Sequence, residues 1–217
     1  MRFRDRRHAG EVLAERLRAD YAGTPGLLVL ALPRGGVPVG FEVARALDGP
    51  LDVFVVRKLG VPGFEELAMG AIASGGVRVL NDAVLADLGI DDDAVARAVA
   101  AENAELTRRE RAYRGDRGPV EVTGRTVILV DDGLATGSTM RAAAVAVRAQ
   151  DPERLVVAVP VASERTCDEF RGDVDEIVCA LTPEPFHAVG LWYEDFTPTS
   201  DEDVRELLAA AAAPAAR

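Results

Sequence analysis

The chain has 217 residues, 48% of them hydrophobic but only 5% aromatic, and its formal net charge is −11. This length suits a single domain, residues 1–217, with a substantial aliphatic core. A strongly acidic chain lacks the clustered cations of a nucleic-acid surface, so we do not expect nucleic acid to be a partner. No apolar run approaches the roughly 20 residues that span a membrane, and no signal-peptide core follows the arginine-rich start. We therefore expect a cytoplasmic protein without a membrane partner.

Basic residues gather near the start of the chain, at Arg2, Arg4, Arg6 and Arg7. We interpret this cluster as a solvated or ion-paired lead-in rather than an arm that binds nucleic acid. The two cysteines, Cys167 and Cys179, lack the spacing of metal ligands and are expected to be buried, reduced thiols.

Apolar runs alternate with segments of helical periodicity along the chain. The expected elements are, in order, a helix over 11–21, a strand over 27–32, a helix over 39–47, a strand over 51–56, a mobile loop over 60–66, a hairpin of 68–73 with 77–80, helical structure within 81–113, a strand over 127–130, a helix over 139–150, a strand over 155–161, a helix over 163–170, a strand over 174–181 and a helical end from 207 that frays. This alternation predicts an α/β fold with a doubly wound, mainly parallel sheet.

The segment of about 81–118 differs from the rest. The aspartates at 91–93 are well placed to cap a long helix, but its apolar positions, Val95, Val99 and Leu106, form only a thin stripe. We therefore predict a helical insertion that stands outside the core and serves as a flap or a homodimer contact.

The most informative segment runs from Val127 to Met140. Four apolar residues, 127–130, are typical of a strand buried on both faces, and Asp131 and Asp132 follow at its end. The next residues offer backbone N–H groups, hydroxyls and a helix start, which together suit a phosphate. Because two carboxylates would repel that phosphate, we expect them to face sugar hydroxyls or a magnesium ion. A Walker B strand would need a G-x-x-x-x-G-K-[ST] partner, which the sequence lacks, and a receiver domain would carry its acidic pair after the first strand.

These fourteen contiguous residues resemble the phosphoribosyl pyrophosphate (PRPP) signature of the type I phosphoribosyltransferases. In that family two acidic residues end a strand and a Thr-Gly-x-Thr loop binds the 5′-phosphate of the sugar. The resemblance implies that Asp131 and Asp132 contact ribose and Mg²⁺, and that PRPP is bound by Gly133, Ala135, Thr136, Gly137, Ser138 and Thr139. It also implies a small hood, here about 182–200, over the acceptor.

Two further strand ends carry cations. Arg34 and Gly35, in Pro33-Arg34-Gly35-Gly36, resemble the first pyrophosphate-binding loop of the family, which often contains a non-proline cis peptide bond. Taken alone, this segment would be an ordinary strand-to-helix turn. Arg57 and Lys58 resemble the start of the second, flexible loop; a solvated strand end is the alternative. Glu65 and Glu66 lie within that loop and would reach the site on closure, or form a solvated tip.

Some purine-using members carry an acidic residue where this chain has Ala135, whereas adenine-using members have alanine there. This difference argues against hypoxanthine or guanine without establishing adenine. In the hood, Phe186 and Trp192 could stack on an acceptor or pack a small core of their own, and neighbouring His187 and Tyr193 complete the aromatic group.

The sequence thus predicts a phosphoribosyltransferase that moves ribose 5-phosphate from PRPP to a nitrogen nucleophile, with Mg²⁺ as cofactor. Arg34, Arg57 and Lys58 would bind the leaving pyrophosphate, and the acidic pair would contact the ribose. Two alternatives remain open. One is a non-catalytic module that senses PRPP or a nucleotide, and the other is a hydrolase or pyrophosphokinase-like enzyme acting on the same sugar.

Overall fold

A five-stranded sheet forms the centre of the protein, which we describe from a computed structural model covering residues 2–115 and 117–213. All neighbouring strands in this sheet are parallel, in the order β2-β1-β6-β7-β8. The strands are β1 (Leu27–Ala31), β2 (Leu51–Val53), β6 (Thr126–Val130), β7 (Arg154–Val161) and β8 (Glu176–Leu181). Every residue of β1 and β6 is buried, as expected for continuous apolar strands covered on both faces.

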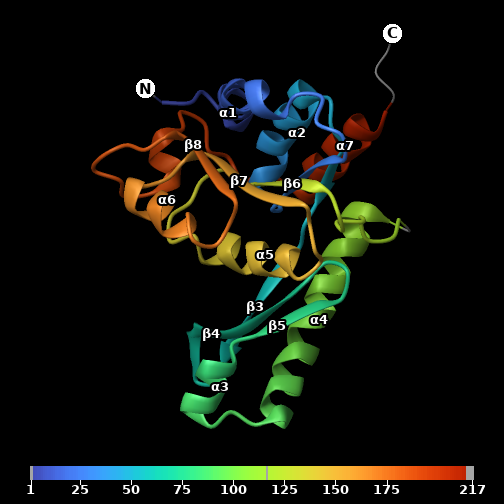
Figure 1. Ribbon diagram of the computed structural model, residues 1–217, viewed down its shortest axis with the longest axis vertical. Helices are drawn as coiled ribbons and strands as arrows, with labels where there is room; N and C mark the ends of the chain where they lie inside the picture. Colours follow the sequence, from blue (N-terminus) through green and yellow to red (C-terminus); the bar gives the residue numbers. More distant parts are fainter. Residues whose placement is uncertain (1, 116, 214–217) are drawn as a thin grey trace.

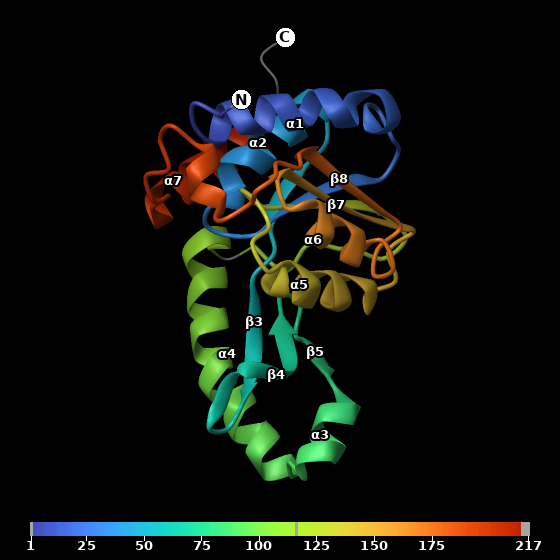
Figure 2. The ribbon, with the colours of Figure 1, turned by 90° about the vertical axis from the view of Figure 1, so that its left-hand side faces the viewer.

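Helices cover both faces of the sheet (Figures 1 and 2). One layer contains α1 (Arg6–Tyr21), α2 (Gly36–Leu47) and α7 (Asp201–Ala212), and the other contains α5 (Ser138–Arg148) and α6 (Glu164–Phe170). Alternate strand residues therefore enter two apolar clusters: Val29 and Ile128 belong to one, and Leu28 and Val127 to the other. The predicted doubly wound, parallel α/β fold is confirmed.

A second, antiparallel sheet of three strands projects away from the first (Figure 2). It consists of β3 (Val56–Val61), β4 (Phe64–Ala73) and β5 (Val77–Leu80), and the predicted pairing of the last two is confirmed. The prediction of a loop over 60–66 is wrong, because β3 and β4 form a hairpin in which Val61 pairs with Phe64. The side chains of Glu65 and Glu66 lie outside the described part of the structure.

Two helices follow the antiparallel sheet, α3 (Asp82–Leu88) and α4 (Asp92–Arg114). The predicted acidic cap is present, since the Asp91 carboxylate accepts a hydrogen bond from the Ala94 N–H at 2.7 Å. Helix α4 runs alongside β3 and ends near α7 (Figure 1).

The expectation that this helix stands outside the core is wrong. Val95, Leu106 and Tyr113 are buried in the larger apolar cluster. Beside them, Arg114 is 5% exposed and its Nε donates to the Asp52 carboxylate at 3.1 Å. Alanines widen the apolar stripe that the larger side chains alone suggested, and a buried ion pair joins the end of the helix to β2.

Helix boundaries differ from the predictions mainly at N-termini. Helix α1 begins at Arg6 because Asp5 caps it, accepting from the His8 N–H at 2.8 Å. Helix α7 begins at Asp201, after Ser200, earlier than the predicted start at 207. Its predicted frayed end, 214–217, lies outside the described residues. No helix in the described part of the chain is long and apolar enough to cross a membrane.

The two cysteines are not the reduced thiols that the sequence suggested. Cys167 on α6 and Cys179 on β8 are joined in a disulfide. The spacing of twelve residues did not reveal this, because it depends on α6 packing next to the strand that follows it.

Candidate active site

The strand order places a topological switch point between the carboxyl ends of β1 and β6. From this pair the sheet continues in opposite directions, and the helices that follow the two strands, α2 and α5, lie on opposite faces. Such a switch point is where open α/β sheets bind ligands. The two strand ends are joined by a hydrogen bond from the Leu32 N–H to the Val130 carbonyl at 2.9 Å. The loop 33–36 and the acidic pair therefore start side by side.

The glycines of the loop 33–36 allow it to lie directly against the acidic pair. A β-carbon built on Gly35 would lie 2.1 Å from Asp132 Oδ2, and one on Gly36 would lie 2.7 Å from the Val130 carbonyl oxygen. Any larger residue at either position would force these groups apart. The Pro33–Arg34 peptide bond is cis, as the resemblance to the family implied.

The acidic pair is fixed by hydrogen bonds. The Asp132 N–H donates to Asp131 Oδ1 at 2.8 Å, and Arg6 Nε donates to Asp132 Oδ2 at 2.9 Å. The Tyr193 hydroxyl donates to the backbone carbonyl of Asp132 at 2.6 Å. Burial raises the pKa of both carboxyls, and the charge of Asp132 raises that of Asp131 further, whereas Arg6 acts to lower the pKa of Asp132.

The loop 133–139, which we name the phosphate loop, presents polar groups to solvent at the start of α5. Ala135, Thr136, Ser138 and Thr139 are exposed, while Gly137 is buried with φ +70°. Helix α6 supports this loop from behind: a β-carbon on Gly137 would lie 2.6 Å from the Phe170 ring, and the Thr166 hydroxyl donates to the Ala135 carbonyl at 3.3 Å. The loop therefore has the open amides, hydroxyls and helix start that suit a phosphate. Gly133, the first residue of the loop, packs closely on Val189 of the hood.

The three predicted pyrophosphate cations do not all meet at the switch point between β1 and β6. Arg34 is half exposed and lies 3.8 Å from the Asp201 carboxylate at the start of α7. Arg57 pairs with Glu102 of α4 at 2.6 Å. Because consecutive strand residues point to opposite faces, Lys58 faces α5 instead. Of the two cations on β3, the structure brings only Lys58 toward the phosphate loop.

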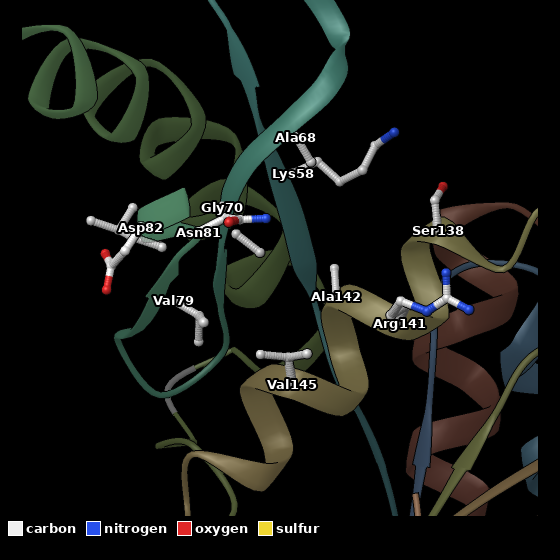
Figure 3. A pocket seen from close by; sticks show the side chains of 12 residues that line it. Lys58, Ala68, Gly70, Val79, Asn81, Asp82, Ser138, Arg141, Ala142 and Val145 are labelled. Atoms are coloured by element: carbon white, nitrogen blue, oxygen red, sulfur yellow. The ribbon is translucent and has the colours of Figure 1, made fainter. Parts of the chain in front are cut away.

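A cavity of about 470 Å³ separates the antiparallel sheet from α5 (Figure 3). Lys58, Ser138 and Arg141 lie at one end of it, where the phosphate loop begins. Apolar side chains such as Ala142 and Val145 form the wall on α5. The cavity thus connects one predicted pyrophosphate cation with one predicted phosphate-binding hydroxyl.

Of the two roles left open for the aromatic side chains of the hood, their packing matches a small core of the hood's own. Phe186 and Trp192 are partly buried against a small cluster that includes Phe3 and Tyr193, so they form a core for the hood. His187 is exposed. Two other aromatic residues lie near the acidic pair. The Tyr193 hydroxyl donates to the Asp132 carbonyl, and the Phe196 ring centre lies 4.0 Å from the Arg6 guanidinium carbon.

The sequence alone does not identify Arg6, Tyr193 or Phe196 as neighbours of the acidic pair. Arg6 and Asp132 are 126 positions apart, and no periodicity or motif connects them. Tyr193 was noted only as part of the aromatic group, and Phe196 was not singled out.

Asp131 and Asp132 could together hold a magnesium ion. Across residues 2–115 and 117–213 no group of three or more His, Cys, Asp or Glu side chains is arranged to hold a metal. Mg²⁺ is usually bound through one or two carboxylates together with substrate phosphates and waters. A neighbouring pair of carboxylates next to a phosphate-binding loop fits that mode of binding.

Comparison with known proteins identifies the family of the chain. A family model described as the phosphoribosyl transferase domain matches residues 6–189, so the chain belongs to that family. It is 48% identical over 202 residues to Rv0571c and MT0597 of Mycobacterium tuberculosis, both named "Putative phosphoribosyl transferase"; the match covers 93% of this chain but 45% of each relative. The crystal structure of TT1426 from Thermus thermophilus shares 46% identity and superposes with a TM-score of 0.89, covering 98% of this chain and 100% of that one.

Proposed function

We propose that this protein transfers ribose 5-phosphate from PRPP to a nitrogen nucleophile and releases pyrophosphate. The observation that carries the proposal is the meeting of three parts at one switch point: the acidic pair, the loop 33–36 and the phosphate loop. The contact between Gly35 and Asp132 Oδ2 joins the first two parts directly. The names of the mycobacterial relatives support the same activity.

Each part has a separate role in binding PRPP. The amides and hydroxyls of residues 135–139 would bind the 5′-phosphate at the start of α5. Asp131 and Asp132 would accept hydrogen bonds from the ribose hydroxyls and hold Mg²⁺, which would shield the charge of the pyrophosphate. Arg34 and the amides near Gly35 would bind the pyrophosphate, because charge-assisted donors suit its oxygens.

In the proposed reaction, the bond between the anomeric carbon and the pyrophosphate oxygen breaks, and its electron pair leaves with the pyrophosphate. The lone pair of the acceptor nitrogen forms the new bond to that carbon, and a proton leaves the nitrogen. Positive charge develops on the ribose ring as the first bond breaks. The acidic pair would stabilise this charge, and Arg34 and Lys58 would stabilise the departing pyrophosphate.

Arg57 and Lys58 would contribute unequally. Lys58 faces the cavity that reaches Ser138, so a small movement of the antiparallel sheet would bring its ammonium group toward bound PRPP. Arg57 would first have to leave Glu102. For the acceptor, the packing of Phe186 and Trp192 supports a structural role for both side chains in the hood.

Pyrophosphate release tests the proposal. Wild-type protein should be incubated with PRPP, Mg²⁺ and a panel of nucleobases and amines, with Asp131→Asn/Asp132→Asn as the inactive control. We expect release that depends on one class of acceptor and is lost in the double variant. Release at equal rates in both proteins, or with no dependence on any acceptor in the panel, would contradict acceptor transfer.

A further inference from the structure

The side chain of Arg6 connects the N-terminal helix, the hood and the acidic pair. Its Nε donates to Asp132 Oδ2 at 2.9 Å and its Nη1 donates to the Thr197 carbonyl at 2.7 Å. Its guanidinium carbon lies 4.0 Å from the centre of the Phe196 ring. The side chain is only 11% exposed, and that of Asp132 is 16% exposed. This arginine is therefore held on three sides, which matches the ion-paired alternative for the N-terminal cluster and not the solvated one.

We infer that Arg6 is a positioning residue for the proposed phosphoribosyl transfer and that it acts through Asp132. The inference rests on the proposed function, because it concerns how the acidic pair is oriented toward the ribose. It also gives a role to the N-terminal helix α1, which has none in the PRPP binding proposed above.

One oxygen of each carboxylate in the acidic pair already accepts a hydrogen bond. Asp131 Oδ1 accepts from the Asp132 N–H, and Asp132 Oδ2 accepts from Arg6. Among the described residues, no donor contacts the second oxygen of either carboxylate. Each aspartate therefore offers one oxygen to a ribose hydroxyl or to Mg²⁺. Without Arg6, the Asp132 carboxylate could rotate. Neither of its oxygens would then be fixed in the position that faces the ribose or Mg²⁺.

The position of the loop 33–36 depends on the same contact between Arg6 and Asp132. A β-carbon on Gly35 would lie 2.1 Å from Asp132 Oδ2 and 3.4 Å from Arg6 Nε, so this loop lies against both groups. Rotation of Asp132 would therefore disturb the position of Gly35 as well. Arg6 holds the ribose-binding and pyrophosphate-binding parts of the site in one arrangement.

The position of Arg6 is itself fixed by pairing between the chain start and the hood. The Glu194 N–H donates to the Phe3 carbonyl at 2.8 Å, and the Asp195 N–H donates to the Arg4 carbonyl at 2.9 Å. These bonds bring Thr197 next to α1. Because Nε and Nη1 of one planar guanidinium donate to groups on different segments, lysine could replace the charge but not both fixed directions.

Isothermal titration calorimetry with PRPP in excess Mg²⁺ tests this role. The proteins are wild type, Arg6→Gln, Arg6→Lys, Asp132→Asn and the double variant Arg6→Gln/Asp132→Asn. Arg7→Gln is the matched control, since Arg7 follows on the same helix but pairs with Glu42 at 3.1 Å. Inorganic phosphate is titrated in parallel because it reports on the phosphate loop without the ribose.

We expect Arg6→Gln to weaken PRPP binding about tenfold, the loss typical of one charge-assisted hydrogen bond, and to leave phosphate binding unchanged. Arg6→Lys should recover only part of the loss, and Arg7→Gln should bind as wild type. In the Asp132→Asn background, Arg6→Gln should cause less than a twofold further loss, because its effect passes through that carboxylate.

Two results would overturn the inference while leaving the proposed function intact. In the first, wild type binds PRPP and Arg6→Gln binds it within twofold. In the second, Arg6→Gln weakens PRPP and phosphate equally, by the same factor with or without Asp132, as general loosening of the fold would. Wild-type protein that binds phosphate but not PRPP would instead contradict the proposed function, and the inference with it.

Discussion

Replacing Gly35 with alanine tests the contact on which the proposed site depends. The added methyl group would lie 2.1 Å from Asp132 Oδ2, whereas ordinary contact begins at 3.4 Å, so the two groups must separate by about 1.3 Å. Loss of a hydrogen bond to a charged group costs about 1.5–3 kcal/mol, which corresponds to roughly ten- to a hundredfold in affinity. The oxygen is at the end of a side chain, so the carboxylate can yield without unfolding the protein.

We therefore expect Gly35→Ala to weaken PRPP binding in Mg²⁺ by about a hundredfold, measured by titration calorimetry, with only a small change in thermal stability. Gly172→Ala is the matched control, because a β-carbon there meets no atom within 4 Å. Binding by Gly35→Ala within threefold of wild type would refute the reasoning, since it would mean that PRPP does not use the geometry of Gly35 and Asp132.

Three further substitutions test other parts of the structure. In Gly137→Ala the added methyl group would lie 2.6 Å from Phe170, and the residue would keep a left-handed φ of +70°. Phosphate affinity measured by calorimetry should therefore fall at least tenfold. Unchanged affinity would mean that this loop does not bind the phosphate. Arg114→Met leaves the Asp52 carboxylate without its buried partner. The free energy of unfolding, measured in urea, should fall by about 3 kcal/mol. A change below about 0.5 kcal/mol would mean that the ion pair does not stabilise the fold. Tyr113 donates to Asp201, and burial raises its pKa from 10.0 to about 12, so folded protein retains this proton more tightly than unfolded protein. That contribution is complete below pH 10 and is lost as the pH rises through 12; Tyr113→Phe should therefore reduce the fall in urea stability over this range, and an unchanged fall would contradict the assignment.

The main sheet could be predicted because its strands are continuous apolar runs, each followed by residues that end a strand. The run 127–130 ends at two aspartates, and the run from 27 ends at Pro33, so both strand ends were identifiable before their neighbours were known. Parallel topology then places such ends at one edge. These local signals were sufficient for the fold, the acidic pair and the two loops beside it.

The antiparallel sheet was harder to predict, although one signal was available. The apolar run 51–56 crosses from one sheet to the other, and its length hides the break at Phe54 and Val55. The period of two in a strand, however, implies that Arg57 and Lys58 point in opposite directions. That rule would have separated their roles.

The contacts of Arg6 and Cys167 depend on tertiary packing and could not be predicted locally. Arg6 reaches Asp132 only because the chain start pairs with the hood. Cys167 reaches Cys179 only because α6 packs on β8. The core position of α4 likewise depends on a buried ion pair at Arg114, whose charge argues for exposure when the sequence is considered alone.

The central claim is that Asp131 and Asp132 bind the ribose of PRPP together with Mg²⁺. Titration of PRPP into wild type and Asp131→Asn/Asp132→Asn, each with and without Mg²⁺, tests it most directly. The account predicts Mg²⁺-dependent binding by the wild type, loss of that dependence in the double variant, and the same affinity of both proteins for inorganic phosphate. Equal, Mg²⁺-dependent PRPP binding by the two proteins would contradict the account.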